Sequence, residues 1–399
     1  MKRLWIVLVP ALLAPVVLAA ATHEQAGPRP AVSPVAASLP RSQRTAAPSE
    51  RLLHNDPHTD PHAIADALVD DIDGVPPGER IDITTYWLES GRIAEALVRA
   101  HRRGVVVHLR VDASSRSRTP EAHTVAAELA RTPDDGSWLH RDRHVAGADE
   151  GILHEKTFRF SRTGADRWVV VTGSWNAADS SDRNTYAAMW RVAGHEDVYD
   201  AFAAAEAAEK ERMRGPGPAR WFRGQGWAAY FLPLSHHAVA ADASIDPVMR
   251  ILRAVPATRT TRVRVAMYSM WDTRAAWIAA ELARISRGGG HVVMVAGPTV
   301  DAATRATLRA AGGQVVNGCF PDGTFVHSKD MALTYVHRGR TVRWTWVGSD
   351  NWTSRGMTSD QAVLGLEGAG PQRQFVAAFA PLARRTDGLD GRTCRPRHD

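Results

Sequence analysis

The sequence predicts an α/β fold made of two similar halves. In each half a strand pattern, a helical pattern and a second strand pattern follow in the same order, at 80–87, 91–103 and 105–111 and again at 263–268, 273–286 and 291–296. Strands separated by helices are typical of parallel β–α–β units. A short motif of His, Lys, Ser and Asn also occurs once in each half. We therefore expect a pseudo-dimer, with the halves related by an approximate two-fold axis.

Further helical patterns extend this repeat. They occur at 61–72 and 245–254, before the first strand of each half, and at 121–131 and 299–311, after the second strand. Pro and Gly residues between 214 and 226 mark the junction of the halves.

The chain of 399 residues is long enough for two such units. Residues 1–21 have a basic start, an apolar run and an Ala-rich end, which predicts a signal peptide; the alternative is an uncleaved anchor. Residues 22–48 are rich in Ala, Pro and Ser and are expected to form a linker. We assign 49–214 and 227–384 to the N- and C-terminal halves and 385–399 to a tail. The leader predicts a secreted, extracellular protein.

The repeated motif lies at the ends of a predicted β-hairpin in each half. The patterns indicate hairpins made of 153–160 with 168–174 and of 326–336 with 341–347. In an antiparallel hairpin the start of the first strand lies beside the end of the second. The side chains expected to meet are His154, Lys156, Ser174 and Asn176 in the first half and His327, Lys329, Ser349 and Asn351 in the second.

These residue types suit a phosphate group. Imidazole can attack phosphorus or transfer protons, and ammonium, hydroxyl and amide groups can donate to phosphate oxygens. The chain has only four lysines, and two of them, Lys156 and Lys329, follow a His by two residues. Because lysine is a compact charge that arginine does not replace, this pattern indicates a site that needs ammonium groups.

With these motifs, the sequence resembles the phospholipase D superfamily, which is marked by a duplicated His-x-Lys…Gly-Ser-x-Asn motif. The resemblance covers nearly all of the chain after residue 50. Two motif copies in matching positions of a repeat are far more specific than one. The resemblance implies a phospholipase D-like fold of two α/β/α sandwich halves, with a single active site between them and with no metal or other cofactor.

The resemblance also implies a two-step mechanism. One His attacks phosphorus and forms a phosphohistidine, and the other protonates the leaving alcohol and then activates water or an acceptor alcohol. By analogy His154 is the nucleophile and His327 the acid and base, although the sequence alone does not order them. The other implied roles are phosphate contacts from Lys156, Lys329, Asn176 and Asn351, and orientation of these groups and of the substrate by Ser174 and Ser349.

The sequence departs from the family motif at one position in each half. Ser161 and Thr334 stand where the family has an Asp, five residues after each Lys. That Asp looks structural in the family, so we expect activity to survive its loss. Two polar residues downstream of the motifs, Asn184 and Asp360, are candidates for orienting the histidines.

Tryptophans cluster beside the motifs in the sequence. Trp87, Trp175 and Trp271 lie next to predicted site elements and could line a substrate pocket, or they could belong to the core. A run of alternating His and Asp between His54 and His62 contains prolines, which favours a solvated loop over a metal site.

The two cysteines, Cys319 and Cys394, are expected to form a disulfide outside the cell; two free thiols are the alternative. The net charge of +6 is mildly basic, which permits anionic partners without requiring them.

Three functions are compatible with these patterns. The first is a secreted phospholipase D that hydrolyses or transfers phospholipid head groups, and the tryptophans and the leader favour it. The second is a secreted nuclease of the same superfamily. The third is an inactive member that binds a phosphodiester without cleaving it. In each case we expect a monomer without an obligate protein partner, and for the lipid enzyme we expect peripheral contact with a membrane surface.

Overall fold

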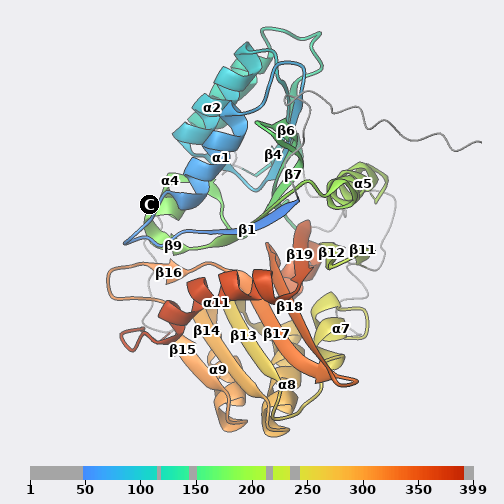
Figure 1. The fold of residues 1–399 in the computed structure, drawn as a ribbon. Coiled ribbons are helices and arrows are strands. Elements are labelled where there is room, and N and C mark those ends of the chain that lie inside the picture. The colour runs from blue at the N-terminus through green and yellow to red at the C-terminus, as the bar shows by residue number, and fades with distance from the viewer. Residues whose placement is uncertain (1–47, 115–117, 143–150, 213–218, 234–242, 391–399) are drawn as a thin grey trace, which may run out of the picture. The chain divides into compact units, whose positions relative to one another are not determined.

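The computed structural model describes residues 48–114, 118–142, 151–212, 219–233 and 243–390. The predicted signal peptide, nearly all of the predicted linker, and Cys394 lie outside the described residues. Each half contains one large mixed sheet, and the two sheets have related strand orders (Figure 1).

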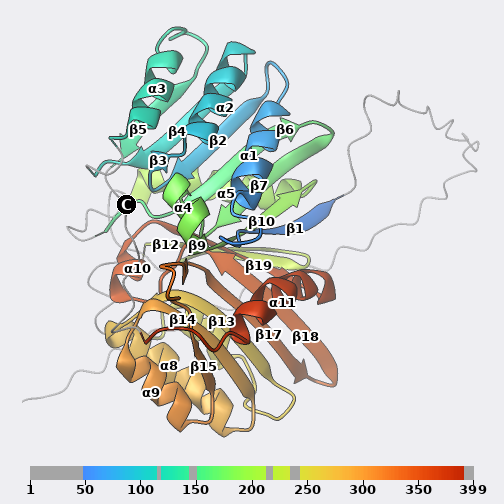
Figure 2. The same ribbon diagram turned by 90° about the vertical axis from the view of Figure 1, so that its left-hand side faces the viewer.

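The first sheet has seven strands. In spatial order they are β1 (Ser49–His54), β10 (Ala188–Ala193), β7 (Asp166–Gly173), β6 (Lys156–Thr163), β2 (Arg80–Thr85), β4 (Val106–Asp112) and β5 (Trp138–Asp142). The last three are parallel and the others antiparallel. Helices α1 (Ala63–Asp73), α2 (Gly91–Arg102) and α3 (Pro120–Leu129) lie along one face of the sheet (Figure 2).

The second sheet has eight strands. In spatial order they are β11 (Arg220–Gly224), β12 (Trp227–Leu232), β19 (Gln361–Glu367), β18 (Arg340–Gly348), β17 (Lys329–His337), β13 (Arg262–Met270), β14 (His291–Val300) and β15 (Gln314–Asn317). Helices α7 (Pro247–Arg253), α8 (Asp272–Arg287) and α9 (Ala302–Ala310) are on one side, and α11 (Ala369–Ala383) covers the other (Figure 1). The predicted parallel β–α–β units therefore form in both halves.

Local sequence explains the helices of these units. Apolar residues at 93, 94, 97 and 100 give α2 one buried face. Gly104, with φ of 87°, allows the chain to turn from α2 into β4. The predicted helix at 299–311 begins later than expected, because β14 continues to Val300. The side chain of Asp301 then accepts a hydrogen bond from the backbone N of Thr304 (2.7 Å), which caps α9.

Both motif hairpins form, but their first strands begin later than predicted. His154 and His327 lie just before β6 and β17, not inside them. The residues before each strand pair with the opposite half instead: Leu153 bridges to Asp360, and β16 (Phe325–Val326) pairs with β9 (Thr185–Tyr186). Each histidine is therefore held where the two halves meet.

A shared hydrophobic core joins the halves. Strands β7 and β10 contribute Val170 and Trp190, and the second sheet contributes Phe231, Val347 and Leu364. Helix α5 (Glu196–Arg212) adds Phe202, whose ring meets that of Phe231 edge-on at 4.9 Å between centroids. All of these side chains are buried, so the seam is a packed interior and fixes the relative positions of the motifs.

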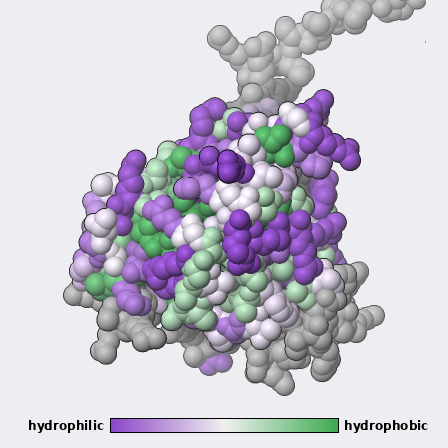
Figure 3. Space-filling model, turned by 90° about the horizontal axis from the view of Figure 1, so that it is seen from below, coloured by the Kyte–Doolittle hydropathy of each residue, from purple (hydrophilic) through white to green (hydrophobic). Residues whose placement is uncertain are grey.

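The surface seen from below has hydrophobic residues in separate patches among hydrophilic ones (Figure 3). Within the described ranges, we find no helix long and apolar enough to span a bilayer.

Candidate active site

The two histidines of the motifs face one cleft of about 600 Å³. Both are more than nine-tenths buried, with 7% of His154 and 8% of His327 exposed. The other residues that line the cleft are Tyr86, Trp87, Glu89, Ile152, Asn176, Ser180, Ser181, Asn184, Thr185, Tyr268, Phe325 and Arg355. Both halves therefore contribute to one site, as the repeat predicts.

His154 is oriented by the second half of the chain. Its Nδ1 lies 3.0 Å from Oε1 of Gln361, and its backbone N donates to the carbonyl of Asp360 at 3.0 Å. Because an amide oxygen only accepts, Nδ1 must carry the proton. The lone pair of Nε2 is then available for a substrate.

His327 is oriented by the first half in a different way. Its Nδ1 lies 3.0 Å from the carbonyl oxygen of Ser174, and its backbone N donates to the carbonyl of Tyr186 at 2.9 Å. The residue that corresponds to Gln361 is Ala187, since Ala188 and Ala362 make matching bonds to the motif serines. The Nδ1 atom of His154 therefore meets a side-chain carbonyl of the opposite half, whereas the Nδ1 atom of His327 meets a backbone carbonyl.

The lysines lie behind the histidines. Lys156 is fully buried and its Nζ donates to the carbonyl oxygen of His154. Lys329 makes the matching bond to the carbonyl oxygen of His327 at 2.6 Å, and its Nζ is 3.3 Å from both ring nitrogens of that residue. The rings of Tyr86 and Tyr268 lie 5.5 and 4.8 Å from the two ammonium groups, which places an aromatic face beside each cation.

The electrostatics of the site favour an anionic ligand. Burial lowers the pKa of both imidazoles well below the ordinary value, and the two lysines lower it further. Burial also lowers the pKa of Lys156 and Lys329. The neutral form of both histidines is thus favoured near pH 7 when the cleft holds no ligand. A phosphodiester would bring a negative charge that favours protonation of these groups.

The motif serines bond to the backbone rather than to the cleft. The hydroxyl of Ser174 donates to the carbonyl of Ala188 (3.2 Å) and accepts from its N (3.0 Å). Ser349 makes the same pair of contacts with Ala362. Both serines are fully buried. The expectation that they contact substrate is not supported: each hydroxyl ties the end of its hairpin to the neighbouring strand.

Of the two motif asparagines, one lines the cleft. Asn176 lines the cleft. The Oδ1 atoms of Asn176 and Asn351 are buried and have no hydrogen-bond partner among the described residues. Because an unpaired buried oxygen is costly, these amides are poised to bond a ligand or water.

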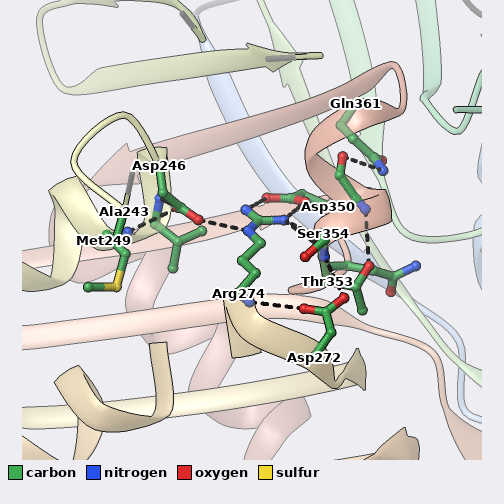
Figure 4. A network of polar contacts seen from close by, with 12 residues as sticks. Ala243, Asp246, Met249, Asp272, Arg274, Asp350, Thr353, Ser354 and Gln361 are labelled. Carbon is green, nitrogen blue, oxygen red and sulfur yellow. Dashed lines mark hydrogen bonds and ion pairs between the residues drawn. The ribbon is translucent and has the colours of Figure 1, made fainter. Parts of the chain in front are cut away.

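A buried ion-pair network centred on Arg274 holds the loop of Asp350 and Thr353 (Figure 4). Arg274, on α8, donates to both carboxylate oxygens of Asp350 at 2.8 and 2.7 Å and to Asp246 at 2.8 Å. It also donates to the carbonyl of Asn351 at 2.8 Å. Arg274 is fully buried, and its bidentate geometry fixes the backbone of the motif loop.

Trp175 occupies the matching place in the first half. It is fully buried in the core and its indole N donates to Asp182 at 2.9 Å. The prediction that Trp175 contacts substrate is therefore wrong. Each residue that follows a motif serine, Trp175 or Asp350, points away from the cleft and anchors its loop by different chemistry.

The remaining candidates divide between the cleft and the surface. Trp87 and Asn184 line the cleft, but Asn184 makes no hydrogen bond to either histidine. Trp271 is 47% exposed and does not line the cleft. Asp360 contributes its backbone to His154, and the neighbouring Gln361 supplies the orienting side chain.

The two departures from the family motif have local partners. Ser161 donates to Glu79 at 2.7 Å and accepts from the backbone N of Arg80 at 2.8 Å. Thr334 accepts from the amide of Gln372, on α11, at 2.6 Å. Neither residue lines the cleft, so each stabilises the scaffold around its hairpin.

Other motifs from the sequence also find partners. Nδ1 of His62 pairs with Asp182 and Nε2 of His58 with Asp322, both at 3.0 Å. Within the described residues, no group of three or more His, Cys, Asp or Glu side chains could hold a metal ion. Cys319 is disulfide-bonded, while its expected partner, Cys394, lies outside the described residues.

Comparisons with known proteins agree with this geometry. Residues 76–206 match the family model described as the PLD-like domain of cardiolipin synthase. The phosphatidylserine synthase of Haemophilus influenzae is similar over 85% of this chain and 86% of its own, with 12% identity and a TM-score of 0.57. Polyphosphate kinase from Porphyromonas gingivalis is similar over 84% of this chain, with 15% identity and a TM-score of 0.53.

This chain spans 51% of the length of the polyphosphate kinase. A search of curated proteins gives no match. At these identities the two structures show a shared fold, not a shared reaction. The family model therefore identifies residues 76–206 as a PLD-like domain, and the second copy of the motif and the shared fold extend the likeness to the phospholipase D superfamily over the second half of the chain.

Proposed function

We propose that the protein is a phosphodiesterase of the phospholipase D type, which cleaves phospholipid head groups through a phosphohistidine. One observation carries the proposal: two histidines from different halves face one cleft, each with Nδ1 bonded to a carbonyl oxygen. This arrangement leaves two Nε2 atoms for a substrate placed between them.

His154 is the nucleophile in this proposal. Its Nε2 attacks phosphorus, and the bond from phosphorus to the leaving oxygen breaks as that oxygen takes the Nε2 proton of His327, which is doubly protonated when the anionic phosphodiester is bound. His327 then takes a proton from water, or from an acceptor alcohol, which displaces His154 and breaks the P–N bond. The side-chain bond from Gln361 supports this order, because it fixes the ring that forms the covalent bond.

The amides and lysines hold the phosphate. Asn176 lines the cleft, Asn351 is the matching residue of the second motif, and Lys156 and Lys329 bond the carbonyls of the two histidines, where a bound phosphodiester favours their charged form. These donors are already fixed in place, so they stabilise charge that develops on the phosphoryl oxygens.

Aromatic side chains in the cleft support a lipid substrate. Tyr86, Trp87, Tyr268 and Phe325 give the walls an apolar surface on both sides of the histidines. Arg355, on α10 (Ser354–Thr358), adds a cationic side chain to the lining.

We also propose that the protein is secreted. The apolar leader at 1–21 supports this location, and so does the disulfide at Cys319, since structural disulfides persist in oxidising compartments.

The substrate is tested with the mature protein, expressed from residue 22 and oxidised. It is incubated in EDTA with phosphatidylcholine vesicles and, separately, with supercoiled plasmid. Free head group and phosphatidic acid with intact plasmid is the expected result. Nicked plasmid with intact lipid would assign the enzyme to the nucleases. If neither lipid nor plasmid is cleaved, the result would favour a protein that binds a phosphodiester without cleaving it.

The order of the histidines is tested by trapping. With a phosphate-labelled lipid analogue whose leaving group is p-nitrophenol, which departs without a proton donor, His327→Ala should accumulate labelled protein, because only the second step then needs the missing base. His154→Ala should not become labelled, and both variants should lose turnover. Label on the His154→Ala protein would reverse the two roles.

A further inference from the structure

A second pocket lies on the second sheet, away from the catalytic cleft. It has a volume of about 440 Å³ and lies beside α7, β11, β12 and β18. We call it the aromatic groove and define it by Trp221, Arg223, Arg250, Trp344, Trp346 and Glu367. Tyr335, which also lines it, is six residues beyond Lys329 on β17, or about 20 Å along the strand.

Two indoles form the floor of the groove. Trp344 and Trp346 project from the same face of β18, and their rings are stacked with centroids 5.3 Å apart and an angle of 20°. Gly365 is the cross-strand neighbour of Trp346, and a Cβ at Gly365 would lie 2.5 Å from that indole. The missing side chain therefore lets Trp346 lie against the strand. The half-buried Trp344 continues the stack outward.

Trp346 also offers an unused donor. The residue is 7% exposed, and its Nε1 has no hydrogen-bond partner among the described residues. A buried N–H without an acceptor costs free energy, and a ligand atom in the groove can supply that acceptor.

The charge on the groove is mainly positive. The guanidinium groups of Arg223 and Arg250 lie 5.1 and 5.2 Å from the centre of the Trp221 ring, and both residues are exposed. Of the described residues that line the groove, Glu367 is the one acid. Guanidinium groups match phosphate oxygens in geometry, so the mouth of the groove suits a phosphorylated ligand.

We propose that the aromatic groove binds a nucleotide. The base stacks on Trp344, the phosphate is bound by Arg223 and Arg250, and an acceptor atom takes the indole N–H of Trp346. The ligand could be a free nucleotide or a nucleotide at the end of a single strand, since both present a base and a phosphate. This site is separate from the proposed phosphodiesterase reaction and does not depend on it.

The test is calorimetric titration of the intact oxidised protein. The probes are adenosine monophosphate, adenosine, inorganic phosphate, maltose and a single-stranded deoxyadenylate pentamer, all in EDTA. The variants are Trp344→Leu, Arg223→Ala with Arg250→Ala, and the control Arg343→Ala, which lies on β18 outside the groove. A His154→Ala/His327→Ala protein separates binding in the groove from binding in the cleft and leaves the pentamer uncleaved.

Adenosine monophosphate should bind more tightly than adenosine or phosphate. The affinity for adenosine monophosphate should fall at least tenfold in both groove variants. It should stay unchanged in the Arg343→Ala control and in the double histidine variant. Turnover of bis(p-nitrophenyl) phosphate by the groove variants should equal that of wild type. If the pentamer binds more tightly than adenosine monophosphate, the ligand is a nucleotide in a single strand. If the pentamer binds equally or more weakly, the ligand is a free nucleotide.

Unchanged nucleotide affinity in both groove variants would overturn the proposal. So would Trp344-dependent binding of maltose alone, which would make the groove a carbohydrate site. The double arginine variant keeps the test valid if Trp344→Leu does not fold, because both arginines are exposed.

Discussion

Oε1 of Gln361 lies 3.0 Å from Nδ1 of His154, and the two residues belong to opposite halves of the chain. The second histidine has no such side chain, since Ala187 takes the corresponding position. The pseudo-two-fold symmetry of the site is therefore broken at the atoms that orient the two imidazoles.

Gln361→Met should reduce kcat about tenfold or more and leave KM nearly unchanged, because it removes the acceptor that orients His154. Gln361→Glu should place a negative charge beside Nδ1, raise the pKa of His154 and move the acidic limb of the kcat/KM profile to higher pH. The control is Gln314→Met, at an exposed position on β15 away from the cleft. An unaltered pH profile in Gln361→Glu would show that Gln361 does not act on the imidazole.

Arg274→Met should lower the free energy of unfolding by about 3–5 kcal/mol, because it leaves two buried carboxylates without their partner. Chemical denaturation measures the loss. Adding Asp350→Asn to Arg274→Met should cost less than the sum of the two single changes, since the pair acts as a unit. Arg284→Met, at a more exposed pair with Glu281 on the same helix, should cost about 1 kcal/mol or less. Additive single and double changes would contradict this account of the network.

Ser161→Asp restores the residue of the family motif and should still not raise activity. The new carboxylate would lie beside Glu79, which accepts the Ser161 hydroxyl at 2.7 Å, and the repulsion should reduce the free energy of unfolding by about 1–2 kcal/mol. Ser161→Asn has a similar size without the charge and should cost less. An increase in kcat for Ser161→Asp would show that the family Asp has a catalytic effect here.

Asp330→Asn should change the free energy of unfolding differently at two pH values. The difference between variant and wild type should be more favourable to the variant at pH 8 than at pH 5. Burial raises the pKa of Asp330 to about 7, whereas Ser328 and Lys329 act in the opposite direction. The folded state therefore holds a proton that the unfolded chain releases near pH 4, and wild type loses up to about 4 kcal/mol as the pH rises from 4 to above 7. Denaturation at pH 5 and pH 8 measures the difference.

The exposed Asp134→Asn is the control for this pH series and should give the same difference from wild type at both pH values. An equal effect of Asp330→Asn at the two pH values would mean that Asp330 does not titrate in this range.

Local patterns were sufficient to predict the β–α–β units and the histidines that share a cleft. Both depend on features that a strand or helix carries within itself: periodicity, turn residues and the placement of a motif at a hairpin end. Lys156 and Lys329 lie next to the histidines for the same reason, and Asn176 lines the same cleft.

Contacts between the halves could not be predicted in this way. Gln361 lies next to the predicted candidate Asp360, but adjacent strand residues point to opposite faces, and only the structure shows which one reaches His154. The prediction for Trp175 is wrong for a similar reason. Its side chain points to the opposite side from those of Ser174 and Asn176 and packs in the core. The sequence did not indicate the ion pairs of Arg274, because its partners Asp246 and Asp350 are far from it in the sequence.

Because each histidine is oriented by the opposite half, the geometry of the site depends on how the two halves pack against each other. His154 takes its orientation from Gln361 and His327 from the carbonyl of Ser174, so each imidazole is aligned by the half to which it does not belong. A small shift of one sheet against the other would misalign both imidazoles together. A substitution in the shared core, far from the cleft, would then abolish the proposed activity before the chain unfolds.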